Sequence, residues 1–200
     1  MKAFRSFAHD LGYEFKLLDE VMKINEDQRQ AFLKKIRSAV WNLRGKRLGV
    51  LGVTFKGGTD DIRESPAIAI IEALIRERCT LSVYDPGGAE RAKKVLPASV
   101  TFVDDPYRAS SGADALLILT DWAEFCNLDL NRISEELAQP IVIDGRNLFD
   151  MQKMAQAGLL YYSVGRSNPM QIEPSERPGL PSQASVQCDI PQHDVTPREC

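Results

Sequence analysis

Between residues 45 and 166, short apolar segments with the character of strands alternate with segments of helical periodicity. The strands expected at 48–53, 115–119 and 141–143 are almost uniformly apolar, which is typical of parallel strands covered on both faces. Strands that alternate with helices are joined by right-handed crossovers, so few chain paths remain possible. The sequence therefore predicts the α/β class, as a Rossmann-like three-layer domain with a mostly parallel sheet.

Composition divides the 200 residues into three parts: 1–44, 45–166 and 167–200. The last part holds six of the eleven prolines and few large apolar side chains, so it is expected to be a disordered tail. The first part predicts two helices: a short one that ends at Gly12, and a long one from about Glu14 to Leu43.

The long helix carries an apolar stripe with three- and four-residue steps, formed by Leu18, Val21, Met22, Phe32, Ile36 and Val40. At 1.5 Å per residue it would be about 45 Å long, which exceeds the width of a small domain. We therefore expect another domain or a second copy of the chain to cover it. Asn25 lies on this stripe, either as a polar residue bonded to a partner or as one that fixes the register of helix pairing.

The net charge of −3, with acids and bases interspersed, indicates neither a nucleic-acid-binding surface nor a basic patch for a membrane. The longest apolar run is far below the roughly 20 residues that a membrane-spanning helix needs. The four cysteines show no CxxC pairing and the chain has two histidines, so no metal site is expected. Free thiols are typical of a cytoplasmic protein.

Cationic residues follow two of the predicted strands, where an open parallel sheet binds its ligands. Lys56 and Arg63 belong to the loop "FKGGTDDIRESP" after the first strand, and Arg146 belongs to "DGRN" after the strand at 141–143. Three converging cations suit a phosphate or diphosphate. The helix expected after the first loop, with Ser65 as N-cap and Pro66 as its first residue, would add its N-terminal dipole.

Other interpretations of these residues remain open. Asp60, Asp61 and Glu64 either orient the cations of the loop or simply neutralise them in a solvated segment. Asp85 stands where a dinucleotide-binding fold places its ribose-binding acid, but "GVLGVTFKGG" lacks the G-x-G-x-x-G turn, which favours a turn-forming role in "DPGG". Cys126 has no nearby histidine, which favours an ordinary thiol over a nucleophile.

Several motifs occur together in one order: "LLDEVMKINEDQ", "GKRLGVLGVTFKGGTDDIRESPAIAIIEAL", "VYDP", "LTDWAEF" and "VIDGRNLFD". Over roughly residues 2–166 the chain resembles the C-terminal part of the nucleotide-sugar dehydrogenases, the UDP-glucose/GDP-mannose dehydrogenase family. The UDP-glucose 6-dehydrogenases are the nearest members by these motifs, and the GDP-mannose dehydrogenases are near relatives. The long helix resembles the central helix that builds the dimer in this family, so a homodimer is implied.

The resemblance implies the NAD-dependent oxidation of UDP-glucose to UDP-glucuronate, with the chain binding the UDP-sugar. It implies that Lys56 contacts the nucleotide sugar and that Phe55 lines the same pocket. Arg146 would bind the UDP portion, in an active site completed across the dimer. Arg63 would reach NAD held mainly by another domain.

The chain also departs from the family pattern. It has no "GGSC" motif, and none of its four cysteines lies in such a context, so no residue is assigned a catalytic role. The chain by itself is therefore expected to be inactive. Two alternatives stay open beside a UDP-sugar-binding part: a non-catalytic nucleotide-sugar-binding or assembly module, and a stand-alone NAD-binding domain. A relative of GDP-mannose dehydrogenase is a third.

Overall fold

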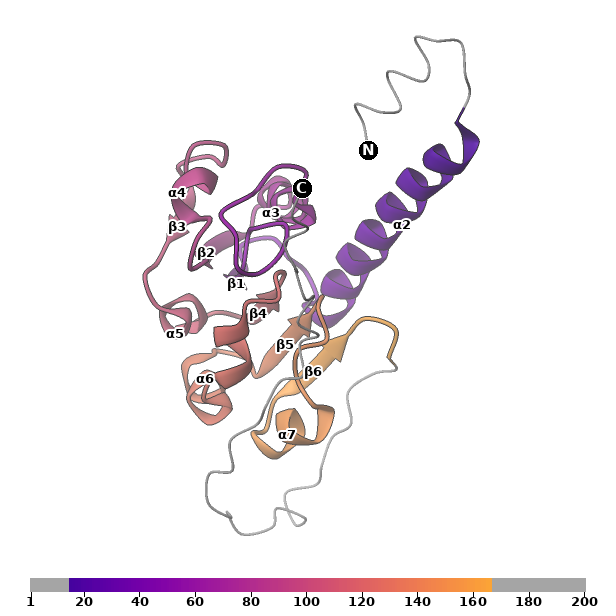
Figure 1. Cartoon of the computed structure of the whole chain (residues 1–200). Coiled ribbons are helices and arrows are strands. Elements are labelled where there is room, and N and C mark those ends of the chain that lie inside the picture. Colours follow the sequence, from indigo (N-terminus) through magenta and orange to yellow (C-terminus); the bar gives the residue numbers. More distant parts are fainter. Residues whose placement is uncertain (1–14, 167–200) are drawn as a thin grey trace, which may run out of the picture.

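A computed structural model describes residues 15–166 (Figure 1). The short helix predicted to end at Gly12 and the tail predicted for 167–200 lie outside the described residues. Within them, no helix is both long and apolar enough to cross a membrane.

Six strands form one sheet in the described part of the chain, in the spatial order β3-β2-β1-β4-β5-β6. Every neighbouring pair is parallel, which confirms the predicted α/β fold with a mostly parallel sheet. The central strands β1, β4 and β5 are almost entirely buried, as their uniformly apolar sequences predict. The strands are β1 (Arg47–Leu51), β2 (Thr80–Tyr84), β3 (Val100–Phe102), β4 (Ala115–Ile118), β5 (Ile141–Asp144) and β6 (Leu160–Ser163).

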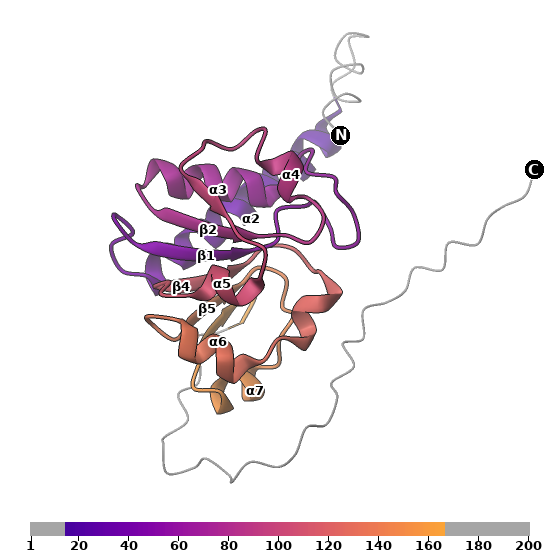
Figure 2. The ribbon, with the colours of Figure 1, turned by 90° about the vertical axis from the view of Figure 1, so that its left-hand side faces the viewer.

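Helices cover both faces of the sheet, so the domain has three layers (Figure 2). One apolar core joins the sheet to α2, α3 and α4, and a second joins its other face to α5, α6, α7 and the 3₁₀ helix η1. The helices are α2 (Lys16–Ala39), α3 (Pro66–Arg76), α4 (Ala89–Ala92), α5 (Pro106–Ser110), η1 (Ala123–Asn127), α6 (Leu130–Glu136) and α7 (Met151–Gln156).

Side-chain caps fix where these helices begin. The Ser65 hydroxyl accepts a hydrogen bond from the Ala67 N–H at 3.2 Å, and Pro66 is the first residue of α3, as predicted. Aspartates cap α5, α6 and α7 in the same way. The helix α4 is short. It ends at Ala92, after which the N–H groups of Lys94 and Val95 form i→i+3 bonds.

The long helix α2 has 24 residues, about 36 Å, and ends at Ala39 rather than near Leu43. The prediction failed because the apolar spacing continues past the last helical turn. Val40 and Leu43 are buried in the core, but Asn42 between them has a φ of 59°, which a right-handed helix cannot accommodate. The chain thus leaves the helix and still fills the same core before β1 begins.

The two halves of α2 have different surroundings. Phe32, Leu33 and Ile36 in the C-terminal half are buried against the sheet. In the N-terminal half, the stripe residues Leu18, Val21 and Met22 are half-buried and belong to neither apolar core. Leu17 and Ile24, which lie beside the stripe, are 70% and 50% exposed. Figure 1 shows this half extending past the sheet. The predicted apolar stripe therefore serves the domain core over only part of its length.

We predict that Ile36→Ala lowers the free energy of unfolding by about 3 kcal/mol, because the side chain is fully buried and its removal leaves a cavity. Urea denaturation measures this change. Val95→Ala is the control, since Val95 is 57% exposed and should change stability by no more than about 0.5 kcal/mol. Equal effects of the two substitutions would contradict the assignment of α2 to the core.

Candidate functional site

The carboxyl ends of β1, β4 and β5 lie side by side in the sheet, and their loops form one edge. The loop after β1 packs directly on the loop after β4. A Cβ at Gly52 would lie 2.4 Å from the Thr120 Cβ, and one at Gly57 would lie 2.3 Å from the carbonyl oxygen of Asp121. Gly52 also has a φ of 91°. These two glycines therefore allow the loop to approach its neighbour, which places "FKGG" beside β4.

The buried carboxylate of Asp85 ties the turn after β2 to the loop after β1. One carboxylate oxygen accepts from the N–H groups of Gly87 at 2.9 Å and Gly88 at 2.6 Å, which confirms the predicted turn-forming role. The other accepts from the Val53 N–H at 2.6 Å, and from the Thr54 N–H, the Thr54 hydroxyl and the Trp122 indole. Six donors exceed the usual acceptor capacity of a carboxylate. Asp85 is therefore not available for the ribose of a dinucleotide.

The acids of the loop after β1 do not act as one group. Asp61 receives two hydrogen bonds from the Arg63 guanidinium, at 2.9 and 2.8 Å, and this holds the pKa of Asp61 well below its usual range. Asp60 instead forms its ion pair with Arg91 of α4 at 2.6 Å and attracts Arg63 of its own loop only through its charge. Lys56 is exposed and makes no hydrogen bond or ion pair within residues 15–166.

Asp121, three residues after the end of β4, connects the other two loops of this edge. The Arg146 guanidinium donates to one of its carboxylate oxygens at 2.7 Å, and the Gly57 N–H donates to the other at 3.1 Å. Burial alone would raise the pKa of Asp121, but the hydrogen bonds and the positive charge of Arg146 together lower it. Our sequence reasoning did not single out Asp121. The available signal was an acid in the loop that follows a fully apolar strand, with one residue between it and the apolar run 115–119.

A second buried acid, Asp144 at the end of β5, shapes the "DGRN" turn. Its carboxylate accepts from the N–H groups of Arg146 and Leu148, both at 2.7 Å, and from the Tyr161 hydroxyl at 2.8 Å. Burial raises the pKa of Asp144 despite these bonds. The Asp144 carboxylate therefore fixes the backbone of the turn that carries Arg146.

A cleft of about 1080 Å³, here called the α2–α3 cleft, lies between α2, the loop after β1, the start of α3 and the loops after β5 and β6. Phe55 and Arg146 both line it, so the structure brings these two predicted residues together. Lys56 and Arg63 are not among its lining residues. The polar and charged side chains of its walls are Asn25, Glu26, Gln28, Arg29, Lys35, Glu64, Ser65, Glu72 and Arg146.

The contribution of α2 to this cleft was missed by the sequence analysis. Asn25, the polar residue on the apolar stripe, lines the cleft together with Arg29 and Lys35. Lys35 also donates to the Ser163 carbonyl oxygen at 2.6 Å, which ties α2 to β6. Only the position of Asn25 on the stripe hinted at this arrangement, because helix periodicity alone does not reveal what α2 faces.

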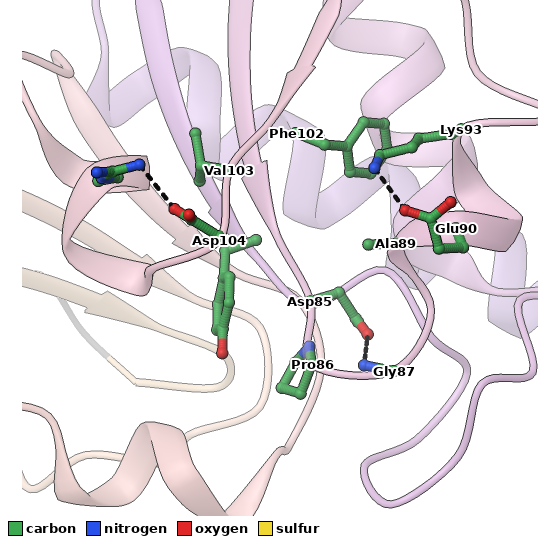
Figure 3. A pocket seen from close by; sticks show the side chains of 11 residues that line it. Asp85, Pro86, Gly87, Ala89, Glu90, Lys93, Phe102, Val103 and Asp104 are labelled. Atoms are coloured by element: carbon green, nitrogen blue, oxygen red, sulfur yellow. Dashed lines mark hydrogen bonds and ion pairs between the residues drawn. The ribbon is translucent and has the colours of Figure 1, made fainter.

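A second hollow of about 580 Å³ lies beyond the carboxyl ends of β2 and β3 (Figure 3). Its charges are already paired: Lys93 with Glu90 at 2.5 Å, and Arg108 with Asp104 at 2.9 Å. This hollow therefore offers no unpaired cation to an anionic ligand. The described residues also contain no group of three histidine, cysteine or acidic side chains placed to hold a metal ion.

A doubly wound parallel sheet with cationic loops at its carboxyl edge defines a nucleotide-binding α/β domain. Residues 49–151 match the model of the UDP-glucose/GDP-mannose dehydrogenase family, UDP binding domain. The chain is 39% identical over 181 residues to UDP-glucose 6-dehydrogenase TuaD of Bacillus subtilis (strain 168). It is 37% identical over 160 residues to UDP-glucose 6-dehydrogenase of Rhizobium meliloti (strain 1021). The chain belongs to the UDP-glucose/GDP-mannose dehydrogenase family.

A solved structure agrees with this assignment. The fold is similar to that of a UDP-glucose dehydrogenase from the hyperthermophilic archaeon Pyrobaculum islandicum, with a TM-score of 0.68 and 31% identity over 82% of this chain. The Bacillus and Rhizobium alignments cover 90% and 80% of this chain. The chain spans 39% of the length of the Bacillus relative and 36% of each of the other two.

We predict that Asp85→Ala destabilises the domain by about 3 kcal/mol or more, because buried N–H groups of two loops lose their acceptor. Thermal or urea unfolding measures the loss. Asp104→Ala is the matched control, since its side chain is 77% exposed and pairs only with Arg108 on the surface. A variant at position 85 as stable as the control would show that the hydrogen bonds of this carboxylate are dispensable.

Proposed function

We propose that the chain binds the UDP portion of a nucleotide sugar in the α2–α3 cleft, as the substrate-binding part of a dehydrogenase that oxidises UDP-glucose to UDP-glucuronate. The observation that carries the proposal is the meeting of Phe55 and Arg146 in one cleft beside the start of α3, within a domain that matches the family's UDP binding model. An aromatic face, a guanidinium and a helix N-terminus together suit a nucleoside diphosphate.

Each of the residues carried over from the family has a role in this proposal. Arg146 binds the diphosphate with the N–H groups that Asp121 leaves unoccupied, and Phe55 packs against the ligand. Lys56 stands between Phe55, which lines the cleft, and Gly57, which is bonded to Asp121. Its ammonium group has no partner in the described chain, so the proposal assigns it to the nucleotide sugar.

The proposal places NAD mainly outside this chain. Asp85 is saturated by hydrogen bonds, and the loop after β1 lacks the dinucleotide turn, so the domain does not fit NAD as its own nucleotide. Arg63, whose side chain is 84% exposed and held by Asp61, is proposed to reach NAD bound by the remainder of a full-length dehydrogenase. The hydride acceptor and the nucleophilic cysteine would belong to that remainder, so this chain alone is proposed to be inactive.

Assembly is a second proposed role, favoured by the exposed apolar residues of α2. Leu17 and Ile24 are exposed apolar residues in the N-terminal half of the helix, which extends past the sheet. We propose that two chains pair through this half to form a homodimer. The predicted division at residue 44 stays a proposal. A cytoplasmic location, favoured by the thiol of Cys79, which forms no disulfide, stays a proposal as well.

Calorimetric titration of UDP-glucose into the purified chain tests the binding proposal, with GDP-mannose as the comparison. We expect weak, selective binding of UDP-glucose, because only part of a full active site is supplied. Selective binding of GDP-mannose would favour the GDP-mannose branch of the family. Absence of binding to either ligand by a folded chain would leave the assembly role.

We predict that Lys56→Ala weakens UDP-glucose binding by about 1.5–3 kcal/mol, the range for a lost hydrogen bond to a charged group. Lys94→Ala serves as the control, because it removes the same charge from an exposed position away from the α2–α3 cleft. If both substitutions weaken UDP-glucose binding by the same amount, Lys56 contributes only through the overall charge of the chain. Arg146→Lys should also weaken binding, because a point charge does not replace a planar fork of donors.

We also predict that size-exclusion chromatography with light scattering gives the mass of a dimer, and that Leu17→Glu with Ile24→Glu gives a monomer, because two charges would enter an apolar interface. Val95→Glu is the control for an exposed apolar residue that lies off α2. A monomeric unsubstituted chain would contradict the assembly role.

A further inference from the structure

We infer that Asp121 is a positioning residue for anion binding. One oxygen of its carboxylate orients the Arg146 guanidinium toward the α2–α3 cleft, and the other fixes the neighbouring "FKGG" loop. This inference rests on the proposed binding of a UDP sugar. Asp121 belongs to the motif "LTDWAEF", but the resemblance assigned it no role, and Asp121 itself does not line the cleft.

The geometry places one carboxylate between two ligand-binding loops. Asp121 follows β4, which lies between β1 and β5 in the sheet. One of its oxygens receives Arg146 Nη2 at 2.7 Å, and the other receives the Gly57 N–H at 3.1 Å. The side chains of Asp121 and Arg146 are 33% and 36% exposed, so water reaches the pair only in part. A change at Asp121 therefore acts on both loops at once.

Backbone contacts fix the position of Asp121 relative to Gly57 and Arg146. Gly57 lies so close that a Cβ would be 2.3 Å from the Asp121 carbonyl oxygen. On the other side, the Arg146 N–H is held by Asp144 at 2.7 Å. The series of hydrogen bonds from Gly57 through Asp121 to Arg146 is thus held at both ends by backbone contacts. Asp121 receives only Nη2 of the guanidinium, so Nε and Nη1 stay available to a ligand, and Arg146 is a lining residue of the cleft.

Positioning and simple electrostatics predict opposite results for the loss of this carboxylate. A negative charge next to a diphosphate site repels the ligand, so its removal alone would strengthen binding. If instead Asp121 holds Arg146 in its binding orientation, its removal weakens binding, because the ligand must then order a mobile guanidinium. The direction of the change decides between the two.

Asp121→Asn is the sharpest substitution, because the amide oxygen still accepts from the Gly57 N–H while the amide nitrogen faces the Arg146 donors. We expect UDP binding, measured by calorimetry on the full chain, to weaken about fivefold, as for one net hydrogen bond. Asp104→Asn is the control that removes the same charge from an exposed surface pair. Unchanged or tighter binding by Asp121→Asn would overturn the inference.

A thermodynamic cycle with Arg146→Ala separates positioning from a general structural role. Once Arg146 is truncated, Asp121→Asn should change UDP affinity by less than about twofold, because nothing is left to orient. An undiminished fivefold loss in the Arg146→Ala background would overturn the inference, since Asp121 would then act through the fold.

A readout in the ligand-free chain keeps this inference distinct from the proposed function. Nitrogen-15 NMR of the Arg146 guanidinium should show hindered rotation in the unsubstituted chain and faster rotation in Asp121→Asn, with signals assigned by their loss in Arg146→Lys. Equally fast rotation in both proteins overturns the positioning role. Hindered rotation in a chain that fails to bind UDP overturns the proposed function while supporting the hold of Asp121 on Arg146.

Discussion

The buried carboxylate of Asp85 joins two loops that leave the sheet from neighbouring strands. It organises the turn after β2 through Gly87 and Gly88, and it anchors the start of the loop after β1 through Val53. In a dinucleotide-binding domain, an acid at this position serves the ligand. Here it serves the protein backbone. The loop that carries Lys56 and Arg63 therefore depends on an interaction that lies beneath it.

The same edge uses three aspartates in two ways. Asp85 and Asp144 are buried and fix the backbone of the turns that follow β2 and β5. Asp121 is partly exposed and bonds to a side chain, the Arg146 guanidinium. The Arg146 cation is thus carried on a turn whose backbone is fixed by Asp144. Such supporting contacts hold a binding group in position before the ligand arrives.

Much of this arrangement could be predicted from the sequence, because local signals govern it. Uniformly apolar segments identify the central strands, Ser65 and Pro66 mark the start of α3, and "DPGG" marks the turn at Asp85. The predicted ligand-binding cations follow β1 and β5, at the carboxyl edge of the sheet. Each of these inferences depends on residues that are neighbours in the chain.

The features that escaped prediction depend on contacts between distant segments. Asp60 pairs with Arg91 of α4 rather than with its own loop, and Asp121 pairs with Arg146, 25 positions away. The end of α2 was misplaced because Val40 and Leu43 keep an apolar spacing after the helical backbone has stopped. Apolar spacing reports which residues are buried, and it does not report the backbone that buries them.

The helix α2 has a double attachment whose consequence is mechanical. Its C-terminal half is locked to the sheet by Phe32 and Ile36, its middle forms a wall of the α2–α3 cleft, and its far half projects from the domain. A continuous helix transmits a displacement along its length, so a partner that moves the projecting end of α2 also moves the cleft wall that α2 forms. A substitution that changes how a partner holds the projecting end would therefore also change the shape of the cleft.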